Sequence, residues 1–223
     1  LEILAKKRVP KMFFDYVNSG SWTETTYNEN VSDFQKIKLR QRVAIDMSNR
    51  TLETKMINQP VSMPVAIAPT GLTGMQRADG EILAAQAAEE FGIPYTLSTM
   101  SVCSIEAVAE KTTKPFWFQL YVMKDKKFME RLIDRAKEAK CSALVLTLDL
   151  QLLGQRHKDL RNGLSTPPKL IPKHIYQVLT RPMWCLRMLT TKNYFFGNIV
   201  GHVEGIKDVR SLGSWSSDVC SSD

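Results

Sequence analysis

From residue 61 onward, short apolar runs alternate with stretches whose apolar residues recur at helical spacing. The runs have the length of buried strands and lie at 63–69, 93–97, 115–121 and 143–150. Three helices are predicted. The first covers 79–91 and is ended by Gly92, the second begins after the N-cap residue Ser104, and the third covers 124–139. The last of these has one apolar face, formed by Phe128, Leu132, Ile133 and Ala136. Four strand and helix units with short connections predict parallel strands joined by right-handed crossovers, and therefore an α/β fold.

The residues before this alternation, 1–60, form a predicted helical segment. Pro10 followed by an apolar pattern predicts a helix at 11–17 that stops near Gly20, and a second helix is expected at 23–34 with Thr23 or Thr25 as its N-cap. Tyr16 lies in the first helix among apolar residues. The pattern alone therefore favours a place in the core for its side chain.

The stretch 151–213 departs from the alternation. It contains no fifth apolar strand, only a basic and polar loop with weakly helical segments near 173–179 and 183–189. Basic and aromatic residues are interleaved there: Lys169, Lys173, Arg181, Arg187 and Lys192 with Tyr176, Trp184, Tyr194, Phe195 and Phe196. Such a mixture suits an anionic membrane surface, an internal surface of a larger protein or, least favoured, a nucleic acid.

The two ends of the chain are unusual. It starts at Leu1 without a methionine, and residues 214–223 repeat Ser-Ser-Asp without apolar periodicity. A segment without such periodicity cannot pack against a core. We therefore expect a fragment that carries a foreign or disordered tail.

Composition narrows the class of protein. The 223 residues are 43% hydrophobic, enough for a substantial core, and the net charge of +7 favours anionic partners only weakly. The cysteines, which are Cys103, Cys141, Cys185 and Cys220, are far apart and suggest neither a zinc site nor a disulfide framework, as is typical of a cytoplasmic protein. The longest nearly apolar run, 61–72, is too short to span a bilayer and is interrupted by two prolines.

Small or polar residues end each predicted strand. They are Pro69-Thr70-Gly71, Ser98-Thr99, Gln119 with Tyr121, and Thr147 with Asp149. In a (β/α)8 barrel the ends of several strands converge on one site, whereas in an open sheet only the strands beside the switch point do so. No G-x-G-x-x-G follows any strand, which disfavours an open dinucleotide-binding sheet. The pattern therefore favours a barrel with its site at this rim.

Five ordered motifs carry a resemblance to a known family. They are Pro10-Lys11-Met12 leading to Asp15-Tyr16; Ile-Ala-Pro-Thr-Gly at 67–71; Thr-Leu-Ser-Thr at 96–99; Phe-Gln-Leu-Tyr-Val at 118–122; and Thr147-x-Asp149 followed by Gly154-x-Arg156 and Asp159. From about Lys7 to Trp215 the chain resembles the N-terminal part of the FMN-dependent α-hydroxy-acid dehydrogenases and oxidases, the family of glycolate oxidase and bacterial L-lactate dehydrogenase. The resemblance implies that 61–150 forms the first four units of a (β/α)8 TIM barrel, truncated after the fourth strand and its long loop, with FMN across the C-terminal mouth.

The resemblance also implies roles for the rim residues. Ala68, Pro69, Thr70 and Gly71 match the loop whose backbone lies against the flavin, and Ser98, Gln119 and Thr147 match side chains that hydrogen-bond it. Tyr16, Tyr121 and Arg156 match substrate contacts. A guanidinium suits a planar carboxylate because it donates two parallel hydrogen bonds. In this context Tyr16 becomes a site residue rather than a core residue.

The implied reaction is FMN-dependent oxidation of an L-2-hydroxy acid, such as lactate, to a 2-oxo acid. The full-length parent would be a homo-oligomer, and it would pass electrons to a quinone or other acceptor if it is a dehydrogenase and to oxygen if it is an oxidase. The basic, aromatic loop favours the dehydrogenase, either cytoplasmic or held peripherally on the inner face of the cell membrane.

The family's catalytic histidine, the arginine that follows it, a lysine on the fifth strand and the turns that hold the FMN phosphate have no match here. His157, His174 and His202 lie in unrelated contexts. We therefore expect no catalysis by these 223 residues alone. The alternative from another class is a non-catalytic membrane- or lipid-binding module built around 169–196.

Overall fold

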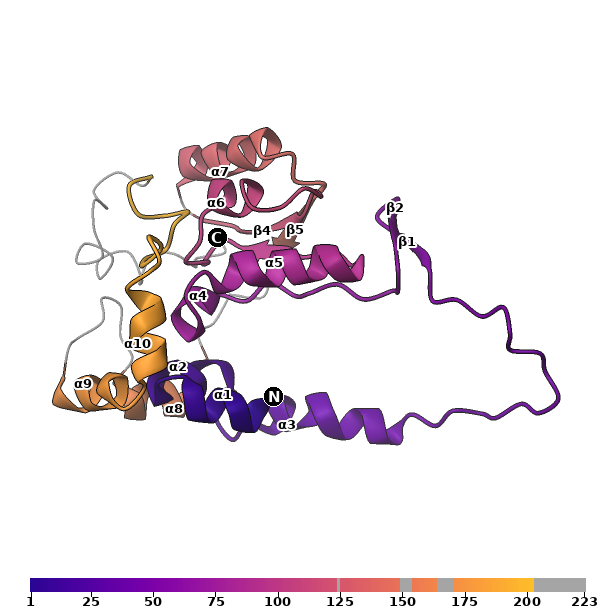
Figure 1. The fold of residues 1–223 in the computed structure, drawn as a ribbon, viewed down its shortest axis with the longest axis horizontal. Coiled ribbons are helices and arrows are strands. Elements are labelled where there is room, and N and C mark those ends of the chain that lie inside the picture. Colours follow the sequence, from indigo (N-terminus) through magenta and orange to yellow (C-terminus); the bar gives the residue numbers. More distant parts are fainter. Residues whose placement is uncertain (124, 149–153, 164–170, 203–223) are drawn as a thin grey trace.

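The computed structural model describes residues 1–123, 125–148, 154–163 and 171–202. At its centre is a parallel sheet whose strands follow the order of the chain: β3 (Thr96–Ser98), β4 (Trp117–Tyr121) and β5 (Ala143–Thr147). Helix α5 (Gly80–Phe91) precedes β3, and α6 (Ile105–Ala109) and α7 (Lys126–Glu138) make the two crossovers (Figure 1). The predicted α/β alternation is therefore confirmed for three of the four units.

The first predicted strand, 63–69, is not a strand. It is reduced to one parallel bridge between Ile67 and Tyr95, in which the Ile67 N–H donates to the Pro94 carbonyl at 2.9 Å and the Ile67 carbonyl accepts from Thr96 at 3.0 Å. The residues in phase with this bridge are Val65 and Pro69: Pro69 has no N–H to donate, and the Val65 N–H donates to the Met63 carbonyl at 2.8 Å, so the ladder does not extend. The bridge still places residues 68–71 beside the end of β3.

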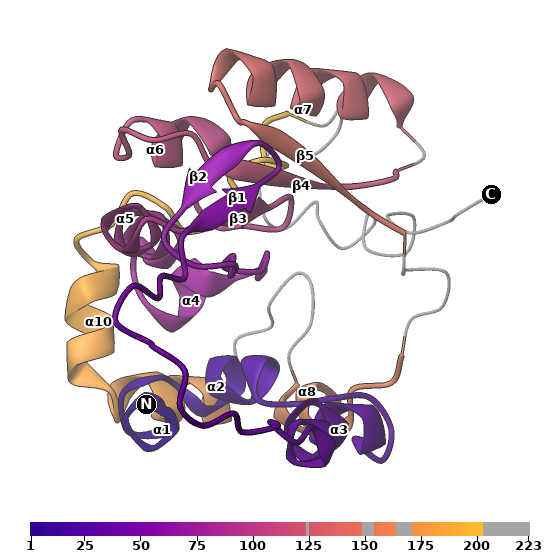
Figure 2. The ribbon, with the colours of Figure 1, turned by 90° about the vertical axis from the view of Figure 1, so that its right-hand side faces the viewer.

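The core lies between the sheet and helices α5, α6 and α7, which Figure 2 shows beside the strands. Leu97, Phe118 and Leu120 are 0–4% exposed and face these helices. The predicted apolar face of α7 is confirmed, since Phe128, Leu132 and Ala136 are buried and Ile133 packs against the same core.

The fourth predicted strand differs from expectation in its burial. Leu144 and Leu146 of β5 are 46% and 52% exposed, although the apolar run predicts a buried strand. In the described part of the chain β5 pairs only with β4, so it forms an edge of the sheet. Asp149, which follows this strand in the motif, lies outside the described residues.

The helix ends test the capping predictions. The Ser104 hydroxyl accepts from the Ala107 N–H at 3.2 Å, and Gly92 ends α5 with φ of +70°, as expected. The prediction for the second helix is wrong in its cap: α3 (Thr25–Ser32) has Glu24 as N-cap, in the left-handed region, and neither Thr23 nor Thr25 caps it. A short 3₁₀ helix, η1 (Asp33–Lys36), continues α3.

A second group of helices lies beside the sheet domain. It contains α1 (Glu2–Arg8), α2 (Lys11–Val17), α8 (His157–Asn162), α9 (Pro172–Leu179) and α10 (Pro182–Met188). Helices α2, α9 and α10 were predicted; α1 and α8 were not. Helix α2 ends at Val17, before Gly20, and packs against both α8 and α9. Helix α10 rises from this group to the level of α5 (Figure 2) and contacts the short helix α4 (Thr73–Gln76).

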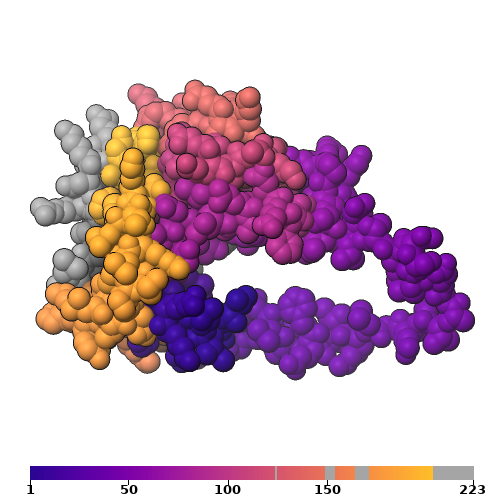
Figure 3. Space-filling model, viewed as in Figure 1, coloured from indigo at the N-terminus to yellow at the C-terminus, as the bar shows by residue number. Residues whose placement is uncertain are grey.

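The chain between η1 and the hairpin β1 (Thr54–Met56) and β2 (Gln59–Val61) projects away from both groups (Figures 1 and 3). The hairpin turn places Ile57 and Asn58 at φ of +47° and +61°. Gln59 Oε1 accepts from the indole N–H of Trp117 at 3.1 Å, so the hairpin covers the amino end of β4. No helix in the described ranges is long and apolar enough to cross a membrane.

Candidate active-site rim

The carboxyl ends of β3, β4 and β5 bring three predicted flavin contacts into one hydrogen-bonded row. The Ser98 hydroxyl donates to Gln119 Oε1 at 3.2 Å, and Gln119 Nε2 donates to Thr147 Oγ1 at 2.8 Å. Ser98 is directly opposite Gln119 in the parallel register, and Thr147 is opposite Tyr121. One residue from each strand therefore contributes to the same polar row.

Hydrogen bonds from Thr99 and Met100, which follow β3, fix this row in place. Gln119 is 1% exposed, and its Oε1 also accepts from the Thr99 N–H at 3.2 Å. The Thr99 hydroxyl donates to the Gln119 carbonyl, and the Met100 N–H donates to the Ser98 hydroxyl at 3.1 Å. Because an amide nitrogen carries two hydrogens, one N–H of Gln119 remains beyond its bond to Thr147.

The loop 68–71 lies beside this row and presents its backbone. Ala68, Pro69 and Thr70 are exposed. Gly71 is in close contact with its neighbours: an added Cβ would lie 3.3 Å from both Met100 Cβ and the Met100 carbonyl, and 3.5 Å from the Tyr16 hydroxyl. A side chain at position 71 would therefore press on Met100, at the end of β3, while its contact with Tyr16 would be an ordinary one.

Tyr16 and Arg156 form a pair next to the loop. The Arg156 guanidinium lies 4.7 Å from the centre of the Tyr16 ring, donates to the Tyr16 carbonyl and to the Ser19 hydroxyl at 2.8 Å, and pairs with Asp159 at 3.0 Å. Burial raises the pKa of the Tyr16 hydroxyl, and the Arg156 charge opposes this rise. Burial likewise raises the pKa of Asp159 while Arg156 lowers it.

The predicted site residues thus fall into two connected sets. The Tyr16 hydroxyl reaches Gly71, and Gly71 packs on Met100, which is bonded to Ser98 at the start of the rim row. Tyr121 is half-buried at the end of β4, beside Thr147. Arg156 lies against Tyr16, and one of its terminal nitrogens donates to protein groups, whereas its Nε is buried without a hydrogen-bond partner although it lies 3.0 Å from Asp159.

Glu81 is a supporting residue that the sequence interpretation missed. This glutamate in the first turn of α5 is 0% exposed, and its Oε1 accepts from the Gly74 N–H at 3.0 Å and the Val102 N–H at 2.9 Å. Gly74 follows the 68–71 loop, and Val102 follows the end of β3. One carboxylate therefore fixes both segments that flank the rim; the only signal was a glutamate early in an apolar helix.

Asn198 supports the rim from the C-terminal stretch. It is 0% exposed; its amide nitrogen donates to the Ser98 carbonyl at 3.4 Å and to the Ser101 hydroxyl at 2.9 Å, and its oxygen accepts from the Ile105 N–H at 2.9 Å. The stretch 151–213 therefore contributes directly to the site's support, which its irregular pattern did not predict.

The histidines lie away from the polar row. His157 packs edge-on against Trp22, with ring centres 5.9 Å apart, and His174 Nε2 lies 2.6 Å from the Asn162 carbonyl. The His202 carbonyl accepts from Arg131 of α7 at 3.0 Å, and burial lowers the pKa of the His202 side chain. Among the described residues, no group of histidine, cysteine and acidic side chains could hold a metal ion.

The aromatic residues predicted for a membrane surface do not all face outward. Trp184 donates its indole N–H to the Met75 carbonyl at 2.8 Å and stacks on Phe13, and Phe196 packs against the core. Tyr176 and Phe195 are exposed. Trp184 and Phe196 are therefore structural, which for these two residues favours the internal surface over the membrane surface; Lys169 lies outside the described residues.

Comparison with known proteins agrees with this geometry. The model of the FMN-dependent dehydrogenase family matches residues 5–217. The chain belongs to this family. Its members are FMN-dependent dehydrogenases and oxidases that act on 2-hydroxy acids.

Two relatives show how much of a full-length family member this chain covers. It is 44% identical over 215 residues to an L-lactate dehydrogenase of Acinetobacter baylyi, covering 94% of this chain and 56% of that protein. An L-lactate dehydrogenase of Vibrio parahaemolyticus is 43% identical over 196 residues, covering 87% and 52%. The chain thus spans about half the length of the curated relatives it matches.

Solved structures show the same fold. The crystal structure of a monotopic membrane protein, (S)-mandelate dehydrogenase, superposes with a TM-score of 0.89 at 30% identity, covering 99% of this chain and 58% of that one. A lactate oxidase of Pediococcus acidilactici gives a TM-score of 0.71 at 30% identity, covering 80% and 49%. The chain therefore has the α/β fold of FMN-dependent TIM-barrel enzymes, and its described residues form separate small sheets rather than a closed barrel.

The described residues suit the ring of FMN. The rim offers a spare amide hydrogen on Gln119, the hydroxyl hydrogen of Thr147, and exposed backbone at 68–70, whereas the Ser98 hydroxyl hydrogen is donated to Gln119. A flavin ring carries several hydrogen-bond acceptors and one N–H donor along its polar edge, which is the complement of such a row. The strand-end positions also agree with where barrel enzymes bind their cofactors.

Proposed function

We propose that this chain is the N-terminal half of a (β/α)8 barrel enzyme that oxidises an L-2-hydroxy acid, such as lactate, to a 2-oxo acid with FMN. The observation that carries the proposal is the Ser98–Gln119–Thr147 row at the ends of adjacent parallel strands. The names of the relatives support the substrate class. Residues 1–60 would be the helical lead-in, 61–150 the first barrel units, 151–213 the long loop region, and 214–223 a tail outside the described residues.

Each proposed role follows from chemistry at the rim. Bound FMN supplies the acceptor for two electrons from the substrate. Ser98, Gln119 and Thr147 orient the ring by hydrogen bonds, and the glycine at 71 lets the 68–71 backbone approach closely. The close contact between the 68–71 loop and β3 would exclude water from this part of the flavin site.

The substrate side is proposed for Tyr16, Tyr121 and Arg156. A carboxylate would bind the Arg156 guanidinium by replacing its contacts to the Tyr16 carbonyl and Ser19. The buried Tyr16 hydroxyl stays protonated at neutral pH and can donate to substrate oxygen, because its pKa is raised above the ordinary value.

We further propose that these residues alone do not catalyse. The three histidines lie away from the rim row, so among the described residues no histidine stands next to the proposed flavin site. The edge strand β5 also leaves Leu144 and Leu146 about half exposed, where a further β/α unit would cover them. Both features indicate a site that needs the rest of a barrel.

A chimera tests this function. Residues 1–202 of this chain would be joined to the remaining C-terminal part of the Acinetobacter baylyi L-lactate dehydrogenase, and FMN content and L-lactate-dependent dye reduction would be measured. We expect bound flavin and activity in the chimera and neither in the unfused chain. Gln119→Leu should lower the FMN content, whereas the distant exposed Lys127→Gln should not. A chimera without flavin, or an active unfused chain, contradicts the proposal.

A second proposal concerns attachment to an anionic membrane surface, which would give the enzyme access to a quinone. The observation that supports this attachment is an apolar outer face on α9 and α10. It is formed by side chains that are 50–70% exposed: Ile175, Tyr176, Leu179, Met183 and Leu186. The printed description of the mandelate dehydrogenase as a monotopic membrane protein supports it. We also propose that the parent protein lies on the inner face of the cell membrane and forms a homo-oligomer.

Sedimentation with anionic vesicles tests the attachment. Tyr176→Ser/Leu179→Ser should reduce the bound fraction several-fold, because two large apolar groups no longer enter the interface. The matched control is Leu83→Ser/Phe91→Ser on α5, which also removes two exposed apolar side chains. Equal losses in both double variants would count against a specific membrane face.

A further inference from the structure

A cavity of about 380 Å³ lies where α1, the end of α4 and α10 meet. Figure 1 shows these three helices at the corner where the second group of helices meets the sheet domain. One part of its wall is apolar and includes Leu4, Ala5, Val9, Met183 and Trp184. The cavity is separate from the flavin rim and uses none of the residues proposed for catalysis.

The other part of the wall carries three arginines and no acid. Arg8, Arg77 and Arg187 all line the cavity, and none of them forms an ion pair among the described residues. Burial lowers the pKa of Arg77, and the charges of Arg187 and Arg8 lower it further. Three mutually repelling guanidinium groups remain charged at neutral pH. An anion placed among them would relieve this repulsion.

A buried polar atom at the same place points to a missing acceptor. Gln76 lines the cavity beside Arg77, and its amide Nε2 is buried without a hydrogen-bond partner. Buried amide donors are nearly always paired, and this one, which has almost no accessible surface, would meet a ligand oxygen once the Gln76 side chain turned toward the cavity. This observation is independent of the charge of the cluster.

We propose that this cavity binds the phosphate headgroup of an anionic lipid. The guanidinium groups would hold the phosphate oxygens, and the apolar wall would receive the first part of the acyl or glycerol moiety. Met183 is 57% exposed and leads from the cavity to the apolar outer face of α10, so a chain leaving the cavity would continue along that face. A small inorganic anion would leave the apolar wall unused.

The proposal does not depend on the flavin chemistry, and it adds a defined headgroup site to the membrane attachment proposed above. A water-soluble lipid separates the two: dihexanoylphosphatidylglycerol below its micellar concentration probes the cavity without any membrane. Titration calorimetry on the whole chain would compare this lipid with inorganic phosphate and with the zwitterionic dihexanoylphosphatidylcholine. The vesicle experiment tests the attachment by itself.

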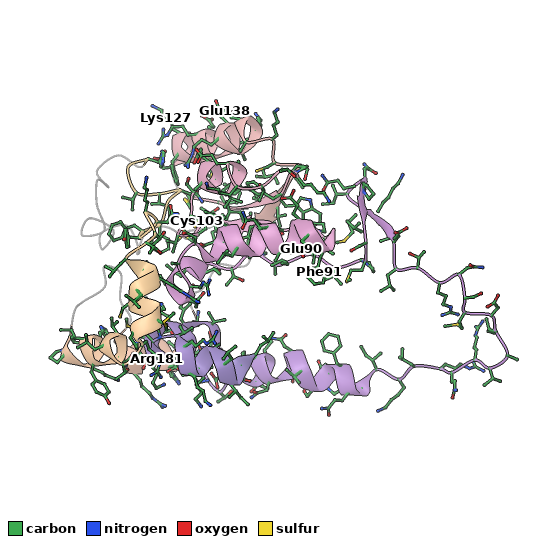
Figure 4. All side chains as sticks on the ribbon, in the orientation of Figure 1. Glu90, Phe91, Cys103, Lys127, Glu138 and Arg181 are labelled. Carbon is green, nitrogen blue, oxygen red and sulfur yellow. The ribbon has the colours of Figure 1, made fainter. Side chains whose placement is uncertain are left out.

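The decisive variant is Arg77→Gln/Arg187→Gln, and the matched control is Lys126→Gln/Lys127→Gln. Both remove two positive charges from exposed or half-exposed positions, and Figure 4 shows Lys127 on α7, far from Arg181 at the α10 corner. We expect the arginine variant to bind the lipid at least about tenfold more weakly and the lysine variant to bind within about twofold of the parent. Thermal melting would show that both variants keep the parent's stability.

Each other outcome overturns the proposal. Equal loss in both variants would mean a general charge effect, and no binding of phosphatidylglycerol would mean no site. Inorganic phosphate binding as tightly as the lipid would mean a free-anion site, and equal affinity for phosphatidylcholine would remove the role of net negative charge.

Discussion

Replacing Glu81 with alanine removes the acceptor of two buried N–H groups, those of Gly74 and Val102. Leaving a buried donor without a partner costs about 1–3 kcal/mol, so the two together should lower the free energy of unfolding by roughly 2–6 kcal/mol. Domains of ordinary stability have about 5–15 kcal/mol in total, so this loss is a large share. Glu81→Gln keeps one oxygen for both donors and should cost only about 1 kcal/mol.

Urea unfolding followed by circular dichroism measures these losses in the free energy of unfolding, and hydrogen exchange locates them. We expect the amides of Gly74 and Val102 to lose protection in Glu81→Ala and to keep most of it in Glu81→Gln. Protection of the Leu132 amide in α7 serves as the internal reference for global unfolding. If Glu81→Ala unfolds within about 1 kcal/mol of the parent, or if the two amides stay protected, Glu81 does not fix the two segments.

Three further predictions follow from named contacts. The Arg135 guanidinium lowers the pKa of Glu106 to about 2. This pair therefore stabilises the fold above the ordinary carboxyl pKa and ceases to do so as pH falls toward 2. In urea titrations, the difference in unfolding free energy between the parent and Arg135→Met should shrink over that pH range. Burial raises the pKa of the Cys103 thiol, so it should react with a disulfide reagent at pH 8 only after unfolding, as read by absorbance. In the chimera, Thr147→Val should weaken FMN binding about tenfold in a fluorescence titration, because it removes the acceptor for Gln119.

The parts of the fold that the sequence predicted are those that local pattern determines. Apolar runs gave β3, β4 and β5, glycine ended α5, and Ser104 capped α6. The first predicted strand failed because an apolar run says nothing about whether its N–H groups have partners: Pro69 lacks the N–H, and that of Val65 bonds to Met63 instead. The exposure of Leu144 and Leu146 depends on what covers β5, which no local pattern records.

The candidate site was predictable to the same extent. Strand ends gave the rim row, since parallel strands bring their carboxyl ends together. Glu81 and Asn198 escaped prediction because their partners, Val102 and Ser98, are backbone groups far away in the sequence. The contacts of Arg156 to Tyr16 and Ser19 were equally hidden, because they join segments about 140 residues apart.

The central claim is that the ends of β3, β4 and β5 form half of a flavin site. Its most direct test is L-lactate-dependent dye reduction by the chimera of residues 1–202 with the Acinetobacter baylyi C-terminal part, measured with D-lactate and the unfused chain as controls. The account predicts bound FMN and reduction with L-lactate alone, lost in Gln119→Leu. A folded chimera that binds no FMN, or an unfused chain that oxidises L-lactate by itself, would contradict it.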